Sequence, residues 1–160
     1  MKKSVLTLLD ELKITYEYFE HDPAYTMSDL SDFDDQTNSI YCKNLFLRNA
    51  NGKIHYLTVV AGDKAVNLKL LAPQIPSSRM SFASEERLQK HLKLSSGHVG
   101  PFGLMNDASG NVMCVLDKDI VDKTRLSFHP NNNAATVIIS YKDLQKYLEH
   151  LKTTVVYVNI

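Results

Sequence analysis

The sequence predicts an α+β protein that forms a single domain over residues 1–160. We expect a curved, mostly antiparallel, barrel-like mixed sheet flanked by helices. Segments with alternating apolar residues outnumber helical segments, and turn dipeptides such as Asn51-Gly52 separate neighbouring strands. No repeat, low-complexity tract or linker interrupts the chain. At 160 residues the chain is long enough to bury one hydrophobic core without disulfides.

The first half of the chain predicts a short helix followed by strands. Valine and leucine recur at helical spacing near the start, and β-branched and aromatic residues then alternate. Asn51-Gly52 is typical of a type I′ hairpin turn, in which both central residues have positive φ. Residues 27–37 are acidic and polar, which indicates a short helix or a covering loop. The other expected elements are a helix over 4–13, strands over 14–20, 41–48 and 54–61, and a helix over 65–71.

The second half predicts two capped helices among further strands. Ser84 is an N-cap candidate that precedes two glutamates, and Ser140 begins a sequence typical of a capping box. The loop over residues 95–103 is rich in glycine. Because hairpins dominate, most of the sheet is expected to be antiparallel. The expected elements are a helix after Ser84, a hairpin of 103–106 with 112–117, strands over 125–128 and 136–140, a helix after Ser140, and a strand over 154–158.

The composition limits the function classes open to the chain. Eighteen Lys and Arg residues balance eighteen Asp and Glu residues, so the formal net charge is zero. This argues against broad, sequence-blind nucleic-acid binding, but it allows a small basic mouth that contacts one end of a nucleic acid. Two cysteines fit a reduced cytoplasm, and no apolar run is long enough to span a membrane. The histidine spacing and the absence of nucleotide-binding motifs predict no metal and no cofactor.

Three stretches at strand ends carry residues suited to chemistry. They are Cys42-Lys43-Asn44, the loop 97–103, and Phe128-His129-Pro130-Asn131. Gly97 and Gly100 allow bare backbone to approach a ligand, and Pro101 stiffens the loop. Its N–H and C=O groups are therefore candidates to grip a small group or to stabilise charge on a carbonyl oxygen. The alternative is an ordinary surface turn.

The side chains at the other two stretches have functional and structural interpretations. Lys43 is suited to orient a phosphate or an ester carbonyl, or else it simply extends to water. His129 is suited to hydrogen bonding or proton transfer near neutral pH, although a lone histidine is often structural. Cys42 beside Lys43 is a candidate nucleophile without an identifiable base, and Cys114 lies in an apolar strand as core.

The order and spacing of several segments together point to one family. The segments are Glu20-His21-Asp22-Pro23, Lys43-Asn44-Leu45-Phe46-Leu47-Arg48, Val66-Asn67-Leu68-Lys69, Arg79-Met80-Ser81-Phe82-Ala83-Ser84, Gly97-His98-Val99-Gly100-Pro101-Phe102-Gly103 and Phe128-His129-Pro130-Asn131. Nearly the whole chain resembles the free-standing trans-editing aminoacyl-tRNA deacylases (YbaK/ProX-like domains) related to the editing insertion of bacterial prolyl-tRNA synthetase. The second and last segments resemble the branch that acts on Ala-tRNA(Pro).

The resemblance implies a cytoplasmic hydrolase that cleaves the ester between a wrong amino acid and the tRNA 3′ end. It implies catalytic roles for Lys43, Gly97 and His129. It implies substrate binding by Asn44, Gly100, Pro101, Phe102 and Asn131. The implied partner is the aminoacylated 3′ end of tRNA(Pro), with prolyl-tRNA synthetase or an elongation factor as open further partners, and we expect a monomer. The segment 27–38 has no confident match in the family pattern.

Three other functions stay open from the sequence. The first is hydrolysis of Cys-tRNA(Pro), in which the substrate thiol takes part. The second is a non-catalytic module that binds the aminoacylated end without shortening its lifetime. The third is an α+β interaction domain in which Lys43 and His129 are structural. A comparison of charged tRNAs separates the first two from hydrolysis of Ala-tRNA(Pro).

Overall fold

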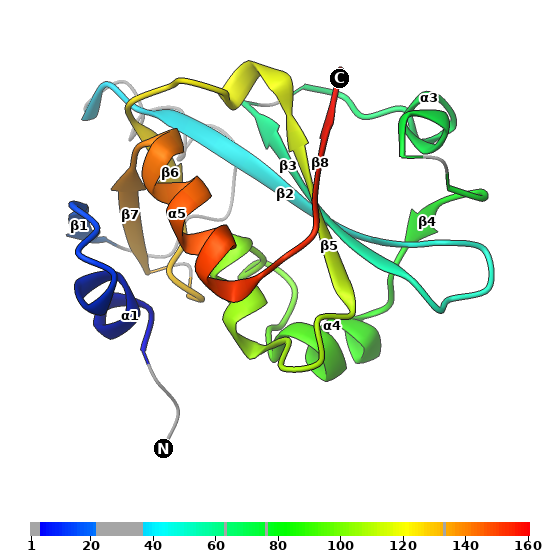
Figure 1. Cartoon of the computed structure of the whole chain (residues 1–160), viewed down its shortest axis with the longest axis horizontal. Coiled ribbons are helices and arrows are strands. Elements are labelled where there is room, and N and C mark those ends of the chain that lie inside the picture. Colours follow the sequence, from blue (N-terminus) through cyan, green and yellow to red (C-terminus); the bar gives the residue numbers. More distant parts are fainter. Residues whose placement is uncertain (1–3, 22–36, 63, 76, 133) are drawn as a thin grey trace.

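The computed structural model describes residues 4–21, 37–62, 64–75, 77–132 and 134–160, and it shows one sheet with helices packed on it (Figure 1). The helices are α1 (Val5–Glu11), α3 (Leu68–Leu71), α4 (Glu85–Leu92) and α5 (Tyr141–Leu151), with 3-10 helices η1 (Ala72–Gln74), η2 (Pro101–Asn106) and η3 (Lys118–Ile120). The strands are β1 (Glu17–Glu20), β2 (Ile40–Arg48), β3 (His55–Ala61), β4 (Ser81–Phe82), β5 (Val112–Asp117), β6 (Leu126–Phe128), β7 (Ala135–Ile139) and β8 (Val155–Val158).

The eight strands follow the order β1-β7-β6-β2-β3-β5-β8, with β4 paired to β2. Strand β2 is the centre of the sheet. It pairs antiparallel with β3, where Lys43 lies opposite Val60, and parallel with β6, where Tyr41 lies opposite Ser127. Antiparallel pairings outnumber parallel ones by four to three. The α+β class and the mixed, mostly antiparallel sheet are confirmed, and the sheet is open because its path ends at β1 and β8.

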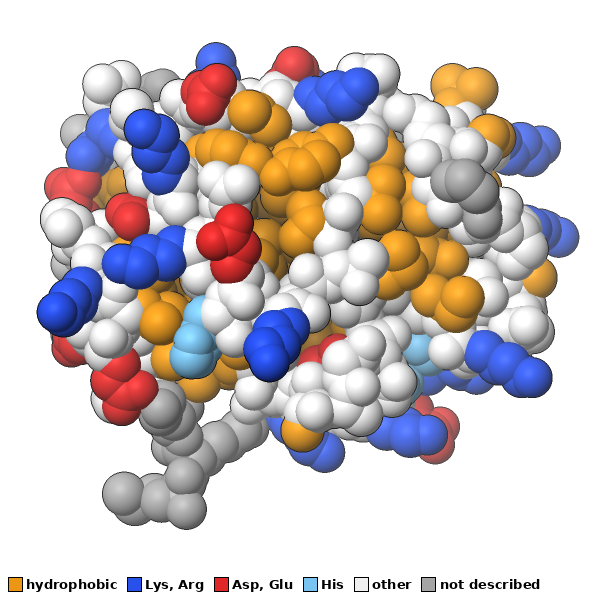
Figure 2. Space-filling model, viewed as in Figure 1, with side chains coloured by type: hydrophobic (Ala, Val, Ile, Leu, Met, Phe, Trp, Pro, Cys, Tyr) orange, Lys and Arg blue, Asp and Glu red, His pale blue; other side chains and the backbone are white. Residues whose placement is uncertain are grey.

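The main hydrophobic core lies between one face of the sheet and the helices α1, α4 and α5 (Figure 1). Its strand residues include Cys42, Leu57, Cys114 and Phe128, which pack with helix residues such as Leu144. A second cluster lies on the other face, where α3 and η1 cover β3, β5 and β8. Figure 2 shows further hydrophobic side chains reaching the surface in the middle of the view, surrounded by charged side chains.

A serine side chain caps the first turn of three helices. The sequence predicted two of these caps, at Ser84 and Ser140. The hydroxyls of Ser4, Ser84 and Ser140 accept hydrogen bonds from backbone N–H groups three residues later. Such caps satisfy N–H groups that have no partner in the first turn, and each contributes about 1 kcal/mol. No helix within the described ranges is long and apolar enough to cross a membrane.

Several local expectations are wrong. Residues 103–106 are not a hairpin strand, because Pro101 begins the 3-10 helix η2 and the Gly103 N–H donates to the Gly100 carbonyl. Strand β5 instead pairs parallel with β3 and β8. The β2–β3 turn is not type I′. Gly52 has φ +70°, Asn51 has no positive φ, and the Gly52 N–H donates to the Asn49 carbonyl.

The helix expected over residues 65–71 is also different. Its α-helical part is the single turn of α3, which continues as the 3-10 helix η1 through Pro73. Asn67 caps this turn through its side chain, which accepts from the Lys69 N–H. Proline is compatible with the start of a helix because its missing N–H has no partner there. Most of the expected element at 27–37 lies outside the described residues.

Candidate active site on strands β2, β6 and β7

One face of β2, β6 and β7 carries polar side chains opposite the main core. Cys42, Phe128 and Val137 belong to the main core cluster. Successive side chains of a strand point to opposite faces of a sheet. The neighbours of these core residues therefore lie on the other face, and we call that set the polar face. Its members are Tyr41, Lys43, Ser127, His129 and Thr136.

The polar face is largely shielded from solvent. Ser127 is 2% exposed, Thr136 is 3% exposed and His129 is 8% exposed. Burying polar side chains costs free energy unless they make hydrogen bonds. The Ser127 hydroxyl pairs with the Ser39 hydroxyl at 2.6 Å, and the Thr136 hydroxyl pairs with His21 Nε2 at 2.7 Å. Ser127 and Thr136 lie on strands that are otherwise apolar, and His129 directly follows β6, which makes this face a candidate site.

Ring contacts join the separate strands of the polar face around His129. The ring centroid of His129 lies 6.5 Å from that of Tyr41 on β2. It lies 6.3 Å from that of His21, which directly follows β1. The imidazole therefore has ring neighbours from two parts of the chain that are far from it in sequence.

His129 is held as a neutral imidazole with a defined tautomer. Its Nδ1 lies 3.0 Å from the Ala135 carbonyl oxygen, which can only accept, so Nδ1 carries the proton. Burial lowers the pKa of His129. The Ala135 carbonyl partly opposes this effect, whereas His21 and His98 lower the pKa further. Near neutral pH the Nε2 atom thus presents a lone pair that can accept a hydrogen bond.

The glycine loop packs directly against the backbone of His129. A Cβ added to Gly100 would lie 3.3 Å from the His129 carbonyl oxygen, so this contact excludes a larger side chain without a local shift. Pro101 then begins η2, and the Asn131 Nδ2 atom donates to the Phe102 carbonyl at 3.4 Å. Five of the eight predicted site residues thus come together. They are Gly100, Pro101, Phe102, His129 and Asn131.

Asn131 is the strained member of this group. It has φ +65°, in the left-handed region that asparagine tolerates better than most residues. Its Oδ1 atom is buried, and no described residue donates a hydrogen bond to it. An unpaired buried acceptor costs about 1–3 kcal/mol, so it needs an explanation. A bound ligand with a hydrogen-bond donor would satisfy it.

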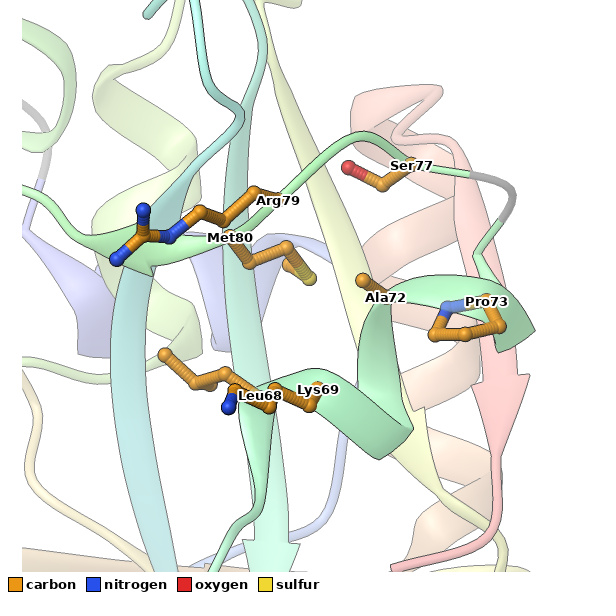
Figure 3. A pocket seen from close by; sticks show the side chains of 7 residues that line it. All are labelled: Leu68, Lys69, Ala72, Pro73, Ser77, Arg79 and Met80. Carbon is orange, nitrogen blue, oxygen red and sulfur yellow. The ribbon is translucent and has the colours of Figure 1, made fainter.

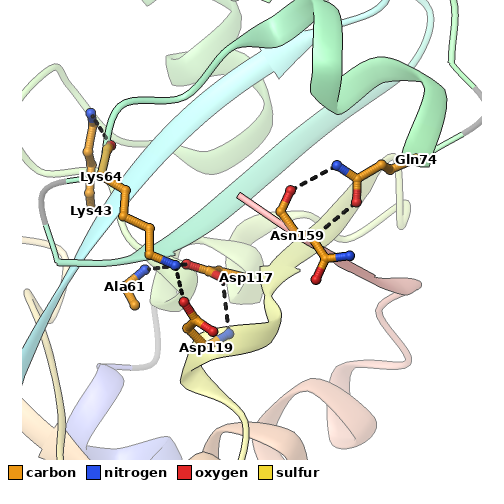
Figure 4. A network of polar contacts seen from close by, with 7 residues as sticks. All are labelled: Lys43, Ala61, Lys64, Gln74, Asp117, Asp119 and Asn159. Atoms are coloured by element: carbon orange, nitrogen blue, oxygen red, sulfur yellow. Dashed lines mark hydrogen bonds and ion pairs between the residues drawn. The ribbon is translucent and has the colours of Figure 1, made fainter.

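Lys43 and Asn44 lie on opposite faces of β2. Lys43 belongs to the polar face, and its ammonium donates to the Lys64 carbonyl at 3.2 Å (Figure 4). Asn44 points to the core side, where its Nδ2 donates to the Cys42 carbonyl at 3.0 Å. Its buried Oδ1 has no hydrogen-bond donor among the described residues. Only one of these two neighbours therefore shares a face with His129.

Gly97 is the most separate of the predicted residues. It is exposed, has φ +86°, and a Cβ placed there would meet nothing within 4 Å. Its positive φ is a backbone requirement that glycine meets without strain. The next residue of the loop, His98, is close enough to His129 that its charge lowers the pKa of His129.

Sequence reasoning missed part of the polar face. Tyr41, Ser127 and Thr136 were not among the predicted site residues, and His21 was noted only in a family segment. The available signal was a single polar residue between apolar ones, as in Leu126-Ser127-Phe128 and Ala135-Thr136-Val137. That alternation predicts two faces, but it does not say which strands are neighbours.

Neither thiol is placed on the polar face. Cys42 and Cys114 both lie in the main core with no exposed surface. Burial raises the pKa of Cys114 to about 12, so it stays a thiol at neutral pH. The Cys42 Sγ atom donates to the Ile40 carbonyl at 3.7 Å. No cluster of three or more His, Cys, Asp or Glu side chains suited to a metal occurs in the described part of the chain.

A separate hollow of about 630 Å³ lies between α3 with η1 and the segment entering β4. Figure 3 shows Leu68 and Lys69 on one side of it and Arg79 and Met80 on the other. Ala72, Pro73 and Ser77 complete its lining, and none of the eight predicted site residues takes part. The hollow nevertheless brings together two segments, around Lys69 and Arg79, that carried the family resemblance.

Known proteins are similar in sequence to this chain over most of its length. The family model for the aminoacyl-tRNA editing domain matches residues 21–147. The prolyl-tRNA editing protein ProX of Acetoanaerobium sticklandii is 47% identical over 148 residues, covering 92% of this chain and 90% of that protein. Prolyl-tRNA synthetase associated domain-containing protein 1 of Bos taurus is 31% identical over 146 residues, covering 89% and 85%.

Solved structures agree on the fold. The crystal structure of the hypothetical protein APE2540 superposes with a TM-score of 0.75 at 17% identity, covering 96% of this chain and 97% of that one. At this identity the likeness concerns the fold alone. The family model and the sequence relatives together show that this chain belongs to the aminoacyl-tRNA editing domain family.

Proposed function

We propose that this protein is a trans-editing aminoacyl-tRNA deacylase that hydrolyses Ala-tRNA(Pro). Family membership supports the reaction class, and the name of the ProX relative supports tRNA(Pro) as the substrate. The structural observation that carries the proposal is the polar face, where His129 packs against the Gly100 loop and shares its side of the sheet with Lys43. We further propose that the chain acts as a single-domain cytoplasmic monomer.

The reaction needs positioning more than a strong nucleophile. An aminoacyl ester is already activated, and holding the reacting groups in place contributes several kcal/mol to lowering the barrier. We assign Lys43 to the negatively charged 3′ end of the tRNA, where a compact ammonium acts as a point charge. The neutral Nε2 of His129 accepts a hydrogen bond from the terminal adenosine. The substrate's own ribose hydroxyl assists the attacking water.

The loop from Gly97 to Pro101 supplies backbone dipoles to the ester. Backbone N–H groups stabilise negative charge that develops on the carbonyl oxygen as water attacks. The packing of Gly100 on the His129 carbonyl fixes the loop relative to the imidazole. We assign the unpaired Oδ1 of Asn131 to a donor on the aminoacyl group, which would satisfy its buried lone pairs.

Alanine is the expected amino acid because of size. A synthetase site built for proline discriminates weakly against alanine, since each lost methylene is worth about 1–3 kcal/mol. A second, smaller pocket corrects the error by excluding the larger proline. A rigid glycine loop, with Gly100 held against the His129 carbonyl, is suited to form such a pocket, in which a methyl side chain fits and a pyrrolidine ring does not.

A deacylation panel tests the proposal. Purified protein is mixed in excess with tRNA(Pro) that carries alanine, cysteine or serine, and release of the amino acid is followed in time. If alanine is released fastest, the result supports Ala-tRNA(Pro) as the substrate. If cysteine is released faster than alanine, the substrate is Cys-tRNA(Pro) instead. Binding of charged tRNA without any release refutes the deacylase proposal in favour of a binding module.

A further inference from the structure

The ammonium of Lys43 is positioned by a backbone carbonyl instead of a carboxylate. It donates to the carbonyl oxygen of Lys64, in the segment that follows β3. In the same segment Gly62 has φ +67°, and its N–H donates to the Tyr41 carbonyl at 2.7 Å. A carbonyl orients the ammonium without neutralising it, so the positive charge of Lys43 stays available. The position of the Lys43 ammonium therefore depends on where the segment that contains Lys64 lies (Figure 4).

Asp117, the last residue of β5, anchors this segment at two points. Its side chain is 1% exposed. Its Oδ2 atom accepts from the Ala61 N–H at 3.0 Å and pairs with the Lys64 ammonium at 2.9 Å. Its Oδ1 atom accepts from the Asp119 N–H at 3.0 Å. The carboxylate thus holds both the end of β3 and the side chain of the residue whose carbonyl holds Lys43.

The ion pair of Lys64 extends to the surface through Asp119. Burial lowers the pKa of Lys64, but hydrogen bonds to Asp119 and Asp117 outweigh this and raise it. Lys64 therefore stays charged across the neutral range, and the two carboxylates are paired with Lys64 rather than with Lys43. In this arrangement Asp117 and Asp119 do not compete for the ammonium of Lys43.

We propose that Asp117 and Lys64 are positioning residues for Lys43. The chain of contacts runs from the Asp117 carboxylate to the Lys64 ammonium, and from the Lys64 carbonyl to the Lys43 ammonium. This inference rests on the proposed role of Lys43 in deacylation. Loss of the ion pair leaves the Lys64 carbonyl in the backbone but removes one of the two anchors between Asp117 and the segment that carries it. The ammonium of Lys43 then loses its fixed direction.

A double-mutant cycle tests this inference. Single-turnover hydrolysis of Ala-tRNA(Pro) is measured for wild type, Lys64→Ala, Lys43→Ala and the double variant, with thermal unfolding of each. Lys64→Ala is expected to slow the reaction about tenfold in the wild-type background and less than about twofold in the Lys43→Ala background, since small displacements of a positioned group carry such costs. Lys64→Arg keeps an ion pair and is expected to restore the rate to within about twofold.

Two further variants serve as controls. Lys146→Ala removes an exposed lysine from helix α5 and is expected to keep the wild-type rate. Asp119→Asn weakens only the exposed part of the ion pair, so its effect is expected to be smaller than that of Lys64→Ala. Asp117→Asn is left out of the cycle, because loss of this buried carboxylate is expected to destabilise the fold. A lower rate of that variant would then not report on the position of Lys43.

The outcomes separate this inference from the proposed function. A slow Lys43→Ala variant together with a wild-type rate for Lys64→Ala overturns the positioning role and leaves the proposed role of Lys43 intact. If Lys64→Ala lowers the rate by the same factor in the wild-type and Lys43→Ala backgrounds, the positioning role is also overturned. Such a result indicates a general structural effect. A wild-type rate for Lys43→Ala overturns the role of Lys43 and the positioning inference together.

Discussion

The ring of Tyr41 lies 6.5 Å from the ring of His129, centroid to centroid. Tyr41 comes from β2 and His129 follows β6, and these parallel strands pair Tyr41 with Ser127. Lys43 and His129 are each two residues beyond that pair in the same direction. A cation and a neutral imidazole therefore lie at corresponding positions of two neighbouring chain segments, on the side of the sheet opposite the main core.

Replacing Lys43 tests the role of the cation. Lys43→Ala is expected to lower the single-turnover rate of Ala-tRNA(Pro) hydrolysis by roughly 10²–10³, similar to the loss of one stabilising donor in other hydrolases. Its thermal midpoint is expected to change little, because the side chain is only half-buried and makes one hydrogen bond to the described part of the chain. A rate close to wild type, in a folded variant, would reject the assignment of Lys43.

The pH dependence of the reaction reports on His129. Burial, with smaller effects of His21 and His98, holds the pKa of His129 below its ordinary value of 6.5. If neutral Nε2 accepts a hydrogen bond from the substrate, activity is retained at pH 7 and falls only when the pH drops below that lowered pKa. The single-turnover rate is measured from pH 5 to 8, corrected for spontaneous hydrolysis. His129→Asn is expected to be slower and to lack this acid limb, and an unchanged acid limb would show that another group titrates.

Gly100→Ala tests the contact between the loop and His129. The added methyl group would lie 3.3 Å from the His129 carbonyl oxygen, so one of the two segments must shift by a few tenths of an ångström. We expect about a tenfold loss of rate with a small loss of stability, because the backbone of Gly100 is extended and unstrained. Gly110→Ala is a control for an added methyl group, which meets nothing within 4 Å in this exposed turn. Its φ of +68° means that a loss of stability is expected there, but the rate of the folded variant is expected to stay at the wild-type value. Equal rates for Gly100→Ala and wild type would show that this contact does not position the site.

The stability of the fold has its own pH dependence, far from the candidate site. Burial lowers the pKa of His55 to about 4, with further effects of His91 and Arg87. Arg87 can only donate to Nε2 at 3.1 Å, so the neutral ring carries its proton on Nδ1. The unfolded chain takes up a proton near pH 6.5 while the folded chain resists it to about pH 4.

The free energy of unfolding is therefore expected to fall by about 2 kcal/mol as the pH drops from 6.5 to 4. Urea denaturation at several pH values measures this change. His55→Gln removes the titrating ring and is expected to flatten the dependence, whereas His150→Gln on the exposed side of α5 keeps it. A His55→Gln profile parallel to wild type would assign the effect to other groups.

Sequence patterns predicted the elements better than their pairing. Helix caps at Ser84 and Ser140 depend on neighbouring residues only, and both are confirmed. Pairing is different, since β5 lies parallel to β3 and β8 although residues 103–106 were expected to be its hairpin partner. Pro101 at the start of η2 overrides that expectation, and the order of strands depends on packing between distant segments.

For the candidate site too, the sequence predicted residues better than their arrangement in space. Lys43, Gly100 and His129 were predicted from residue type and family pattern, and the structure places Gly100 against His129. Strand alternation places Lys43 on the same side as His129 and Asn44 on the core side. This conclusion requires knowing which side of β2 faces the core. The role of Lys64 was not predictable, because its backbone carbonyl makes the contact and carries no signal of residue type.

The most direct test of the proposed alanine-sized pocket compares two esters of one tRNA. Single-turnover hydrolysis of Ala-tRNA(Pro) and Pro-tRNA(Pro) is measured with the wild-type protein under identical conditions. We predict that the alanyl ester is cleaved about 100-fold faster or more, because the proposed smaller pocket excludes the proline ring. Equal rates for the two esters, or hydrolysis of neither by the folded protein, would contradict it.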